Sequence, residues 1–159
     1  MHPNLRRVAE AGRRAGLELE VRRFPEGTRT AEDAARAIGC DVAQIVKSLV
    51  FMADRRPVIA LVSGADRVDT ERLAAAAEVA AARRASGDEA RTATGFAIGG
   101  VPPFGHAREL TVLVDPGLLE HELLWAAAGL PDAVFPIRPD DLVRVSGGRV
   151  TALAERSPA

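Results

Sequence analysis

The chain has 159 residues, of which 47% are hydrophobic and 27% charged, and its formal net charge is −1. The length fits one domain, and this composition excludes intrinsic disorder. The single cysteine excludes a disulfide scaffold, and no apolar run reaches the roughly 18 residues of a membrane span. The first residues lack the apolar core of a signal peptide. We therefore expect one domain over residues 1–159, in the cytoplasm, whose nucleic-acid contacts, if any, are local.

Apolar spacing and turn residues divide the first half of the chain into helices and strands. Leu17, Leu19 and Val21 alternate with charged residues, which predicts a half-buried strand. Thr30 precedes a helical apolar pattern that Gly39 ends, as an N-cap and a C-terminal glycine do. The elements expected in this half are a helix over 3–15, a strand over 17–24, a helix over 31–38, a short helix from Asp41 that ends near Lys47, and a hairpin of strands 48–52 and 57–62.

Aspartates and prolines mark the boundaries of elements in the second half. Asp69 and Asp88 stand where helix caps are expected, and Pro139 where a helix opens. The segment 78–85 fits a helix or a short strand at 81–84, and 118–128 fits a helix or a helix followed by a strand. Further expected elements are helices over 69–77, 88–95 and 139–145 and strands over 110–114, 133–137 and 149–153. Hairpins mixed with helices indicate a mixed α/β, α+β-like fold with an antiparallel-rich sheet.

Several kinds of chemistry leave no signature in the chain. Neither G-x-G-x-x-G nor G-x-x-x-x-G-K-[ST] occurs, so no nucleotide-binding loop is indicated. His2, His106 and His121 form no H-x-x-x-H pair, which argues against zinc. No G-x-S-x-G motif occurs, and Cys40 has no histidine near it in sequence and is typical of a core residue. We therefore expect no metal, no cofactor and no recognisable covalent nucleophile.

Lys47 is the only lysine among the 21 lysine and arginine residues. An ammonium group and a guanidinium group bind ligands differently, so a lysine retained in an arginine-rich chain is a candidate functional residue. Lys47 stands beside the hydroxyl of Ser48 at a predicted junction of helix and strand, at the edge of the sheet. The alternative interpretation is an ordinary surface lysine.

Residues 99–105 contain three glycines and two prolines. Glycine allows close approach to the main chain and proline fixes its shape, so such a loop can present N–H groups to an ester oxygen. The alternative is a plain tight connection. Asp115 follows an apolar strand and precedes Pro116-Gly117, which favours a helix cap over a role in holding Lys47 or ordering the loop.

Six segments together resemble the YbaK/ProX family of aminoacyl-tRNA deacylases, and likewise the editing domain of bacterial prolyl-tRNA synthetases. They are residues 30–35, 44–51, 62–69, 94–106, 114–115 and 128–129. The resemblance implies a curved, mostly antiparallel sheet flanked by helices. It also implies trans-editing: hydrolysis of the ester that joins a wrong amino acid to tRNA, with Ala- or Cys-tRNA for proline as the expected substrate. No cofactor is implied. The implied partners are the 3′ acceptor end of aminoacyl-tRNA and, further, prolyl-tRNA synthetase, without a membrane.

The resemblance also assigns candidate site residues. The family's lysine falls on Lys47, and its loop falls on 100–105, where the family often has serine in place of Pro102. Catalytic roles are implied for Lys47, Gly100 and His106: the lysine anchors the terminal nucleotide or polarises the carbonyl, and the histidine orients water or supports the loop. The candidate substrate-binding residues are Ser48, Ser63, Gly64, Val101, Pro102, Pro103, Phe104, Gly105 and Asp115.

Two other functions fit the same residues. One is a non-catalytic module that binds a tRNA end or a protein, and the other is an esterase for small molecules. Two groups of arginines are candidate phosphate contacts, whose binding would weaken with salt. They are Arg6, Arg7, Arg13 and Arg14 on the first helix, and Arg83 and Arg84. For the arginines of the first helix, a solvated face is the favoured alternative.

Overall fold

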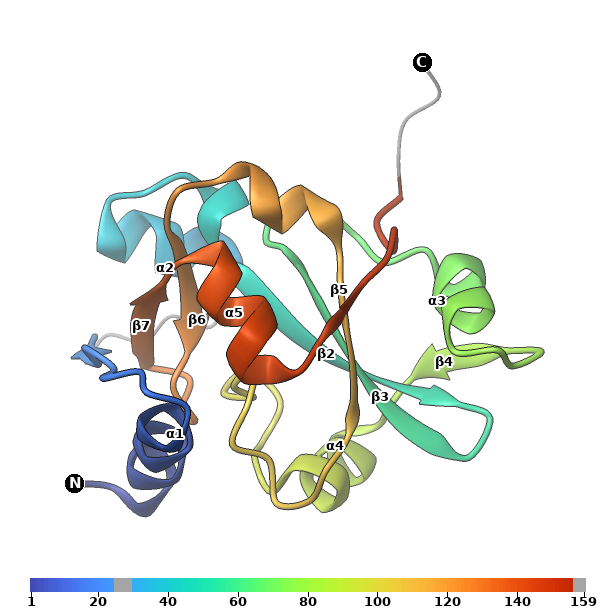
Figure 1. Cartoon of the computed structure of the whole chain (residues 1–159), viewed down its shortest axis with the longest axis horizontal. Coiled ribbons are helices and arrows are strands. Elements are labelled where there is room, and N and C mark those ends of the chain that lie inside the picture. Colours follow the sequence, from blue (N-terminus) through green and yellow to red (C-terminus); the bar gives the residue numbers. More distant parts are fainter. Residues whose placement is uncertain (25–29, 156–159) are drawn as a thin grey trace.

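A computed structural model describes residues 1–24 and 30–155 (Figure 1). The helices are α1 (Pro3–Arg14), α2 (Ala31–Ile38), α3 (Thr70–Ala76), α4 (Gly87–Thr94) and α5 (Pro139–Ser146), with the 3₁₀ helices η1 (Val42–Gln44) and η2 (Pro116–Glu120). The strands are β1 (Arg22–Arg23), β2 (Val46–Ala53), β3 (Arg56–Ser63), β4 (Ala82–Arg84), β5 (Thr111–Val114), β6 (Leu124–Ala127), β7 (Ala133–Ile137) and β8 (Arg149–Val150).

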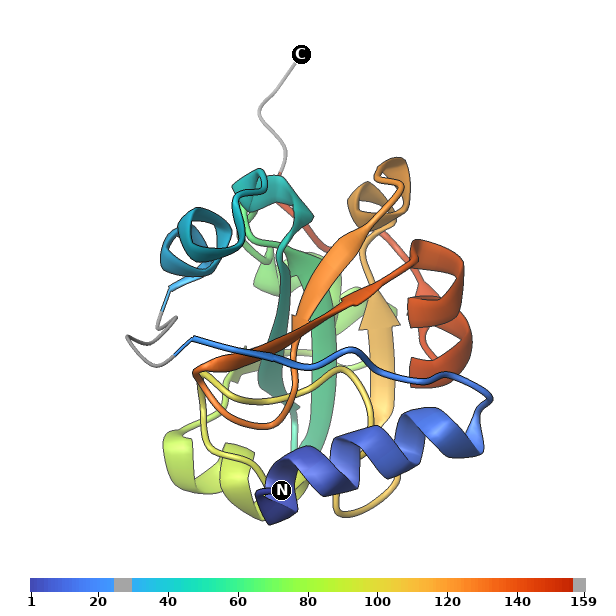
Figure 2. The same cartoon turned by 90° about the vertical axis from the view of Figure 1, so that its left-hand side faces the viewer.

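The strands form two sheets that pack against each other. The larger sheet has the order β4-β2-β3-β5-β8, in which β4, β2 and β3 pair antiparallel and β3, β5 and β8 pair parallel. The smaller sheet, β1-β7-β6, is antiparallel and lies across one face of the larger one (Figure 2). A core fills the space between them, with Ile59 and Leu61 from β3 and Leu124 and Phe135 from the smaller sheet. The predicted mixed α/β fold with mostly antiparallel pairing is confirmed.

The β2–β3 hairpin is the central element, and it sets the direction of each side chain along β2. The two strands pair without interruption from Val46–Ser63 to Ala53–Arg56. Because side chains alternate along a strand, Val50 joins the core between the sheets, whereas Phe51 joins a second core on the opposite face, against Leu73 of α3.

Local capping residues explain why most helices form where the sequence predicts them. The Thr30 hydroxyl accepts a hydrogen bond from the Asp33 N–H at 3.0 Å and begins α2, and Gly39 ends it at a φ of 85°. The prediction for α4 was wrong about the cap. Ser86, not Asp88, caps this helix through a reciprocal pair with Glu89. The ambiguous segments resolve into β4, and into η2 followed by β6.

Three predicted elements differ from the structure. The helix expected from Asp41 is only the 3₁₀ turn η1, because β2 already begins at Val46, so Lys47 is a strand residue rather than a junction residue. The strand expected over 17–24 shortens to β1, although Leu17, Leu19 and Val21 pack on the core as the alternation predicts. The closing strand shortens to β8. No helix within the described ranges has the length and apolarity needed to cross a membrane.

Candidate functional site

A cavity of about 290 Å³ opens beside the first half of β2. It exists because β4 pairs only with residues 51–53 of β2 and leaves the edge before them uncovered. β6 approaches this edge from the smaller sheet through a parallel bridge between Ile45 and Trp125. The cavity, called the edge cavity below, is lined by Thr30, Ala31, Ala34, Ile45, Val46, Lys47, Ser48, Leu49, Val50, Arg84, Ala85, Ile98, Gly99, Val101, Trp125, Ala126, Ala127, Pro131, Ala133 and Val134.

Lys47 supplies a half-buried cation to the edge cavity. Its Nζ donates a hydrogen bond to the main-chain oxygen of Asp66, which follows β3. Burial lowers the pKa of Lys47, and the carboxylates of Asp66 and Glu32 partly counter this, while Arg84 and Arg67 add to it. The ammonium therefore lies at a site where a further electron-rich group, such as a carbonyl or phosphate oxygen, would be favourable.

Ser48 points to the opposite face of β2 from Lys47, toward the core between the sheets. Its Oγ is buried and, within the described part of the chain, has no hydrogen-bond partner. An unsatisfied buried hydroxyl costs about 1–3 kcal/mol. Ser48 also lines the edge cavity, so its buried hydroxyl lies next to that space.

The loop predicted to bind substrate reaches the edge cavity through its first residues, Gly99 and Val101. The Gly100 N–H donates to the Ala97 oxygen at 3.0 Å, so this amide is already engaged. A Cβ at Gly100 would lie 3.0 Å from the main chain of Leu130, which explains the glycine. Among the described residues, the N–H groups of Gly99 and Val101 have no partner and are the amides that an ester oxygen could meet.

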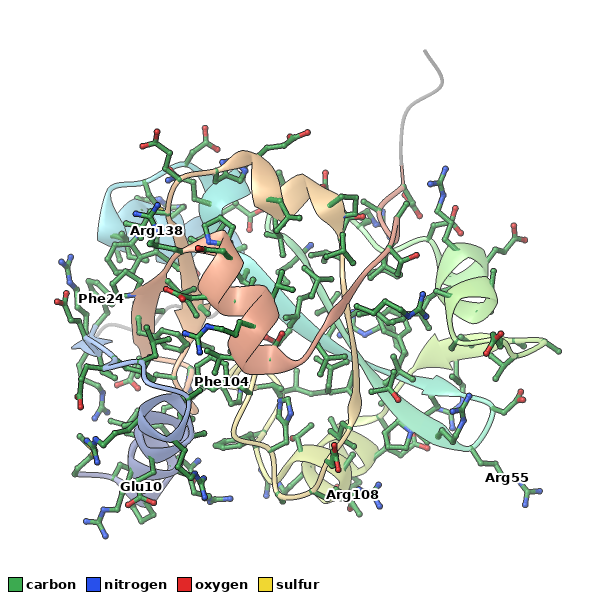
Figure 3. The ribbon with its side chains drawn as sticks, viewed as in Figure 1. Glu10, Phe24, Arg55, Phe104, Arg108 and Arg138 are labelled. Atoms are coloured by element: carbon green, nitrogen blue, oxygen red, sulfur yellow. The ribbon has the colours of Figure 1, made fainter. Side chains whose placement is uncertain are left out.

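The rest of the loop turns away from the edge cavity into the protein. Pro102 and Pro103 are buried, and Phe104 packs inside with its ring centroid 5.6 Å from that of Phe135 (Figure 3). The His106 Nε2 lies 2.7 Å from the Pro102 oxygen. Because a carbonyl only accepts, Nε2 carries the proton. Burial lowers the pKa of His106.

Gly105 completes the anchoring of the loop. It adopts a φ of 83°, and a Cβ built on it would contact Val8 and Ala11 of α1. None of the residues from Pro102 to His106 lines the edge cavity in the structure of residues 1–24 and 30–155. Their geometry is that of a support, which holds Gly99 and Val101 in place.

Three other candidate residues have structural roles and do not line the edge cavity. The Ser63 Oγ donates to the Ala43 oxygen at 2.8 Å. A Cβ at Gly64 would lie 2.6 Å from the Val42 oxygen, so glycine lets η1 pack onto the end of β3. The fully buried Asp115 carboxylate accepts N–H groups from Gly117, Leu153 and Ala154 at 2.8–3.0 Å. The structure thus brings Lys47, Ser48 and Val101 to one cavity. Ser63, Gly64 and Asp115 make structural contacts and are not part of its lining.

Sequence reasoning did not single out Trp125 as a site residue, and it named Arg84 only as a candidate phosphate contact. Trp125 forms a wall and stacks on its other side with the Arg22 guanidinium, 4.9 Å from the ring centroid. Arg84 lines the cavity from the end of β4. Trp125 carried no signal as a site residue, because only the pairing of Ile45 with β6 brings it to β2. Within residues 1–24 and 30–155, no three His, Cys, Asp or Glu side chains form a group that could hold a metal.

Comparison with known proteins identifies the family to which this fold and cavity belong. Residues 25–145 match the family of aminoacyl-tRNA editing domains. This match covers well over half of the chain, and the chain belongs to that family.

Individual relatives agree with the family. The uncharacterized protein YwhH of Bacillus subtilis is 31% identical over 133 residues, which span 84% of this chain and 85% of YwhH. The proline–tRNA ligase of Limosilactobacillus fermentum is 29% identical over 109 residues, which span 65% of this chain but 19% of the ligase. A crystal structure of a candidate trans-editing enzyme for prolyl tRNA synthetase matches with a TM-score of 0.92 and 41% identity, over 98% of this chain and 99% of that one.

Proposed function

We propose that this protein hydrolyses the ester bond of mischarged aminoacyl-tRNA, with alanyl- or cysteinyl-tRNA for proline as its substrate. The observation that carries the proposal is that Lys47, Ser48, Gly99 and Val101 line one cavity. Among the described residues, the Ser48 hydroxyl and the N–H groups of Gly99 and Val101 have no hydrogen-bond partner. A cation, a hydroxyl and main-chain N–H donors are the groups that stabilise an acyl oxygen as negative charge develops on it. The family and the similar trans-editing structure support the same reaction.

The reaction needs no covalent enzyme intermediate. The oxygen of water adds to the ester carbonyl carbon, and the carbonyl oxygen becomes an oxyanion. The bond from this carbon to the ribose oxygen then breaks, and the ribose oxygen takes the proton that water loses. In this scheme Lys47 and the Gly99 and Val101 amides bind the oxyanion, because they line the cavity that would hold it. His106 acts indirectly by holding Pro102.

The walls of the edge cavity favour a small amino acid. Ala126, Ala127 and Ala133 line it together with Trp125, and the whole space is about 290 Å³. A synthetase gains only about 1–3 kcal/mol of discrimination per methylene, so small amino acids that escape the synthetic site require a second site. The alanine side chains make this part of the lining apolar, which suits the small and weakly polar side chains of alanine and cysteine.

Replacement of the lysine tests the proposal. We expect Lys47→Ala to lower the rate of deacylation of alanyl- or cysteinyl-tRNA for proline by about 10²–10³-fold, the cost of removing one oxyanion donor. The measurement is release of labelled amino acid from a panel of mischarged tRNAs, corrected for spontaneous hydrolysis. The matched control is Arg55→Ala, which removes a cation at the exposed β2–β3 turn (Figure 3). Arg55→Ala should retain the wild-type rate.

Three outcomes contradict the proposal. Normal turnover by Lys47→Ala would remove the lysine from the mechanism. A wild-type protein that binds tRNA ends but releases no amino acid from any member of the panel would be a binding module rather than a deacylase. Equal hydrolysis of small esters that lack the terminal adenosine would instead indicate a general esterase.

A further inference from the structure

A second hollow of about 710 Å³ lies beside the edge cavity. We call it the polar groove, and it shares Lys47, Leu49 and Arg84 with the edge cavity. It extends over the face of β2 that carries Phe51 and reaches the start of α3. Its charged lining also includes Arg67, Asp69, Glu71, Arg72 and Glu155.

The cations of the polar groove are only partly neutralised by protein carboxylates. The Arg72 guanidinium lies 3.5 Å from the Asp69 carboxylate, so the charges of these two residues neutralise each other. Among the described residues, neither Arg67 nor Arg84 comes within 4.0 Å of a carboxylate.

Lys47 is a third cation of the groove. The carboxylates that remain to balance these three cations are those of Glu71 and Glu155. The Arg84 guanidinium is held over the Phe51 ring, 5.5 Å from its centroid. Stacking leaves the edge of the guanidinium plane able to form paired hydrogen bonds to a phosphate. The end of the groove nearest the edge cavity is therefore cationic, and its Arg84 side chain is held in place by Phe51.

The size of the edge cavity favours a place outside it for the rest of an RNA substrate. Sites that enclose a complete drug-sized ligand usually measure about 300–1,000 Å³. The edge cavity, at about 290 Å³, lies at the small end of this range, so we assign to it the aminoacyl group and not the strand that precedes it. A ligand leaving it past Lys47 and Arg84 enters the polar groove.

We infer that the polar groove binds the phosphodiester backbone of a single-stranded RNA 3′ end, with Arg84 and Arg67 on its phosphates. This inference rests on the proposed function, because it takes the edge cavity as the aminoacyl site. Arg84 is a positioning residue: it lies at the junction of the two spaces and fixes the strand where the ester enters the cavity.

Binding of uncharged RNA tests the inference. The probe is a fluorescent hairpin RNA that ends in a single-stranded CCA, compared with the same hairpin cut to a blunt end. We expect Arg84→Gln and Arg67→Gln each to weaken binding of the tailed hairpin several-fold. Each should also reduce the slope of log affinity against log salt by about 0.7, the value for one contact to a single-stranded phosphate.

The chain offers a matched control on the same strand. Arg83 neighbours Arg84 on β4, but its side chain lies on the other face of the strand and pairs with both Glu89 oxygens at 2.8 Å. Arg83→Gln removes the same charge and should leave affinity and salt slope unchanged. Thermal unfolding of each variant establishes that it is folded.

The outcomes separate this inference from the proposed function. If Arg84→Gln and Arg83→Gln bind the tailed hairpin equally, or if the blunt hairpin shows the same dependence on Arg84, the inference is overturned, whatever the deacylase activity. If binding depends on Arg84 but the wild-type protein hydrolyses no aminoacyl ester, the deacylase proposal fails and the RNA groove stands. With active enzyme, Arg84→Gln should slow hydrolysis of a charged tailed hairpin by a larger factor than hydrolysis of aminoacyl-adenosine, which has no phosphate.

Discussion

Ser48 and Lys47 are adjacent in the chain, yet they serve different faces of β2. Strand alternation sends the hydroxyl toward the core between the sheets and the ammonium toward the main-chain oxygen of Asp66. Both still line the edge cavity, because the cavity wraps around an uncovered strand edge. A ligand at that edge can meet a neutral donor and a cation from two consecutive residues.

His106 gives the loop a dependence on pH that stability measurements detect. Burial lowers the pKa of His106 below its ordinary 6.5, so the unfolded chain takes up the proton more readily than the folded one. Stability from this residue is therefore complete above pH 6.5 and is lost as pH falls below it. We expect the stability advantage of wild type over His106→Gln to shrink between pH 7 and pH 5.

Urea denaturation of both proteins across this pH range measures the effect. The two proteins differ only at position 106, so the difference in stability reports on His106. A stability difference that stays constant from pH 8 to pH 5 would contradict a buried, neutral His106.

Gly100 tests whether the contact of the loop with Leu130 matters for the site. A Cβ there would lie 3.0 Å from the Leu130 main chain, which cannot yield as a flexible side chain does. We expect Gly100→Ala to destabilise the protein by about 1–3 kcal/mol, the usual cost of overpacking, and to slow deacylation as Gly99 and Val101 shift. Urea denaturation and the deacylation assay measure the two effects.

Gly87 provides the matched substitution. It lies in the first turn of α4, and nothing stands within 4 Å of a Cβ built on it. Gly87→Ala should stabilise the protein by about 0.4–1 kcal/mol through the unfolded state. If Gly100→Ala and Gly87→Ala are equally stable, the close contact with the Leu130 main chain does not require glycine at position 100.

At the scale of elements, Asp115 joins three segments that are distant in sequence. Its buried carboxylate binds the start of η2 and the main chain at Leu153 and Ala154. We expect Asp115→Ala to lower the free energy of unfolding by at least about 3 kcal/mol, because three main-chain N–H groups lose a charged acceptor. Amide hydrogen exchange at Leu153 and Ala154 should accelerate in the same variant.

An exposed aspartate supplies the comparison for that substitution. Asp140 lies in the first turn of α5, with its side chain 82% exposed. Asp140→Ala should change stability by less than about 0.5 kcal/mol. If Asp115→Ala proves no more harmful than Asp140→Ala, the carboxylate does not hold the C-terminal segment.

Elements with local signals were predictable, and elements that depend on distant partners were not. Helix α2 is marked by its cap residues Thr30 and Gly39, and α5 by the first-turn Pro139. These signals depend on residue type alone and can be read from the sequence. The alternation at Leu17 to Val21 predicted which side chains are buried but not how short the ladder is. Pairing there depends on β7, more than a hundred residues away.

At the scale of the whole molecule, the edge cavity is a product of how the two sheets meet. Lys47, Ser48 and Val101 could be chosen from sequence, since residue type and resemblance single them out. The opposite wall could not, because Trp125 belongs to β6 and reaches β2 only through its bridge to Ile45. Phe104 and Asp115 were chosen with them, yet their contacts are with the core and the C-terminal segment.

Trp125 is the only tryptophan in a chain without tyrosine. Ultraviolet emission of the protein therefore comes almost wholly from one indole, and that indole is a wall of the edge cavity. Occupancy of the cavity changes the surroundings of this ring, so the intensity and wavelength of its fluorescence can report binding in real time. Binding in the edge cavity can therefore be followed by intrinsic fluorescence, without an attached dye.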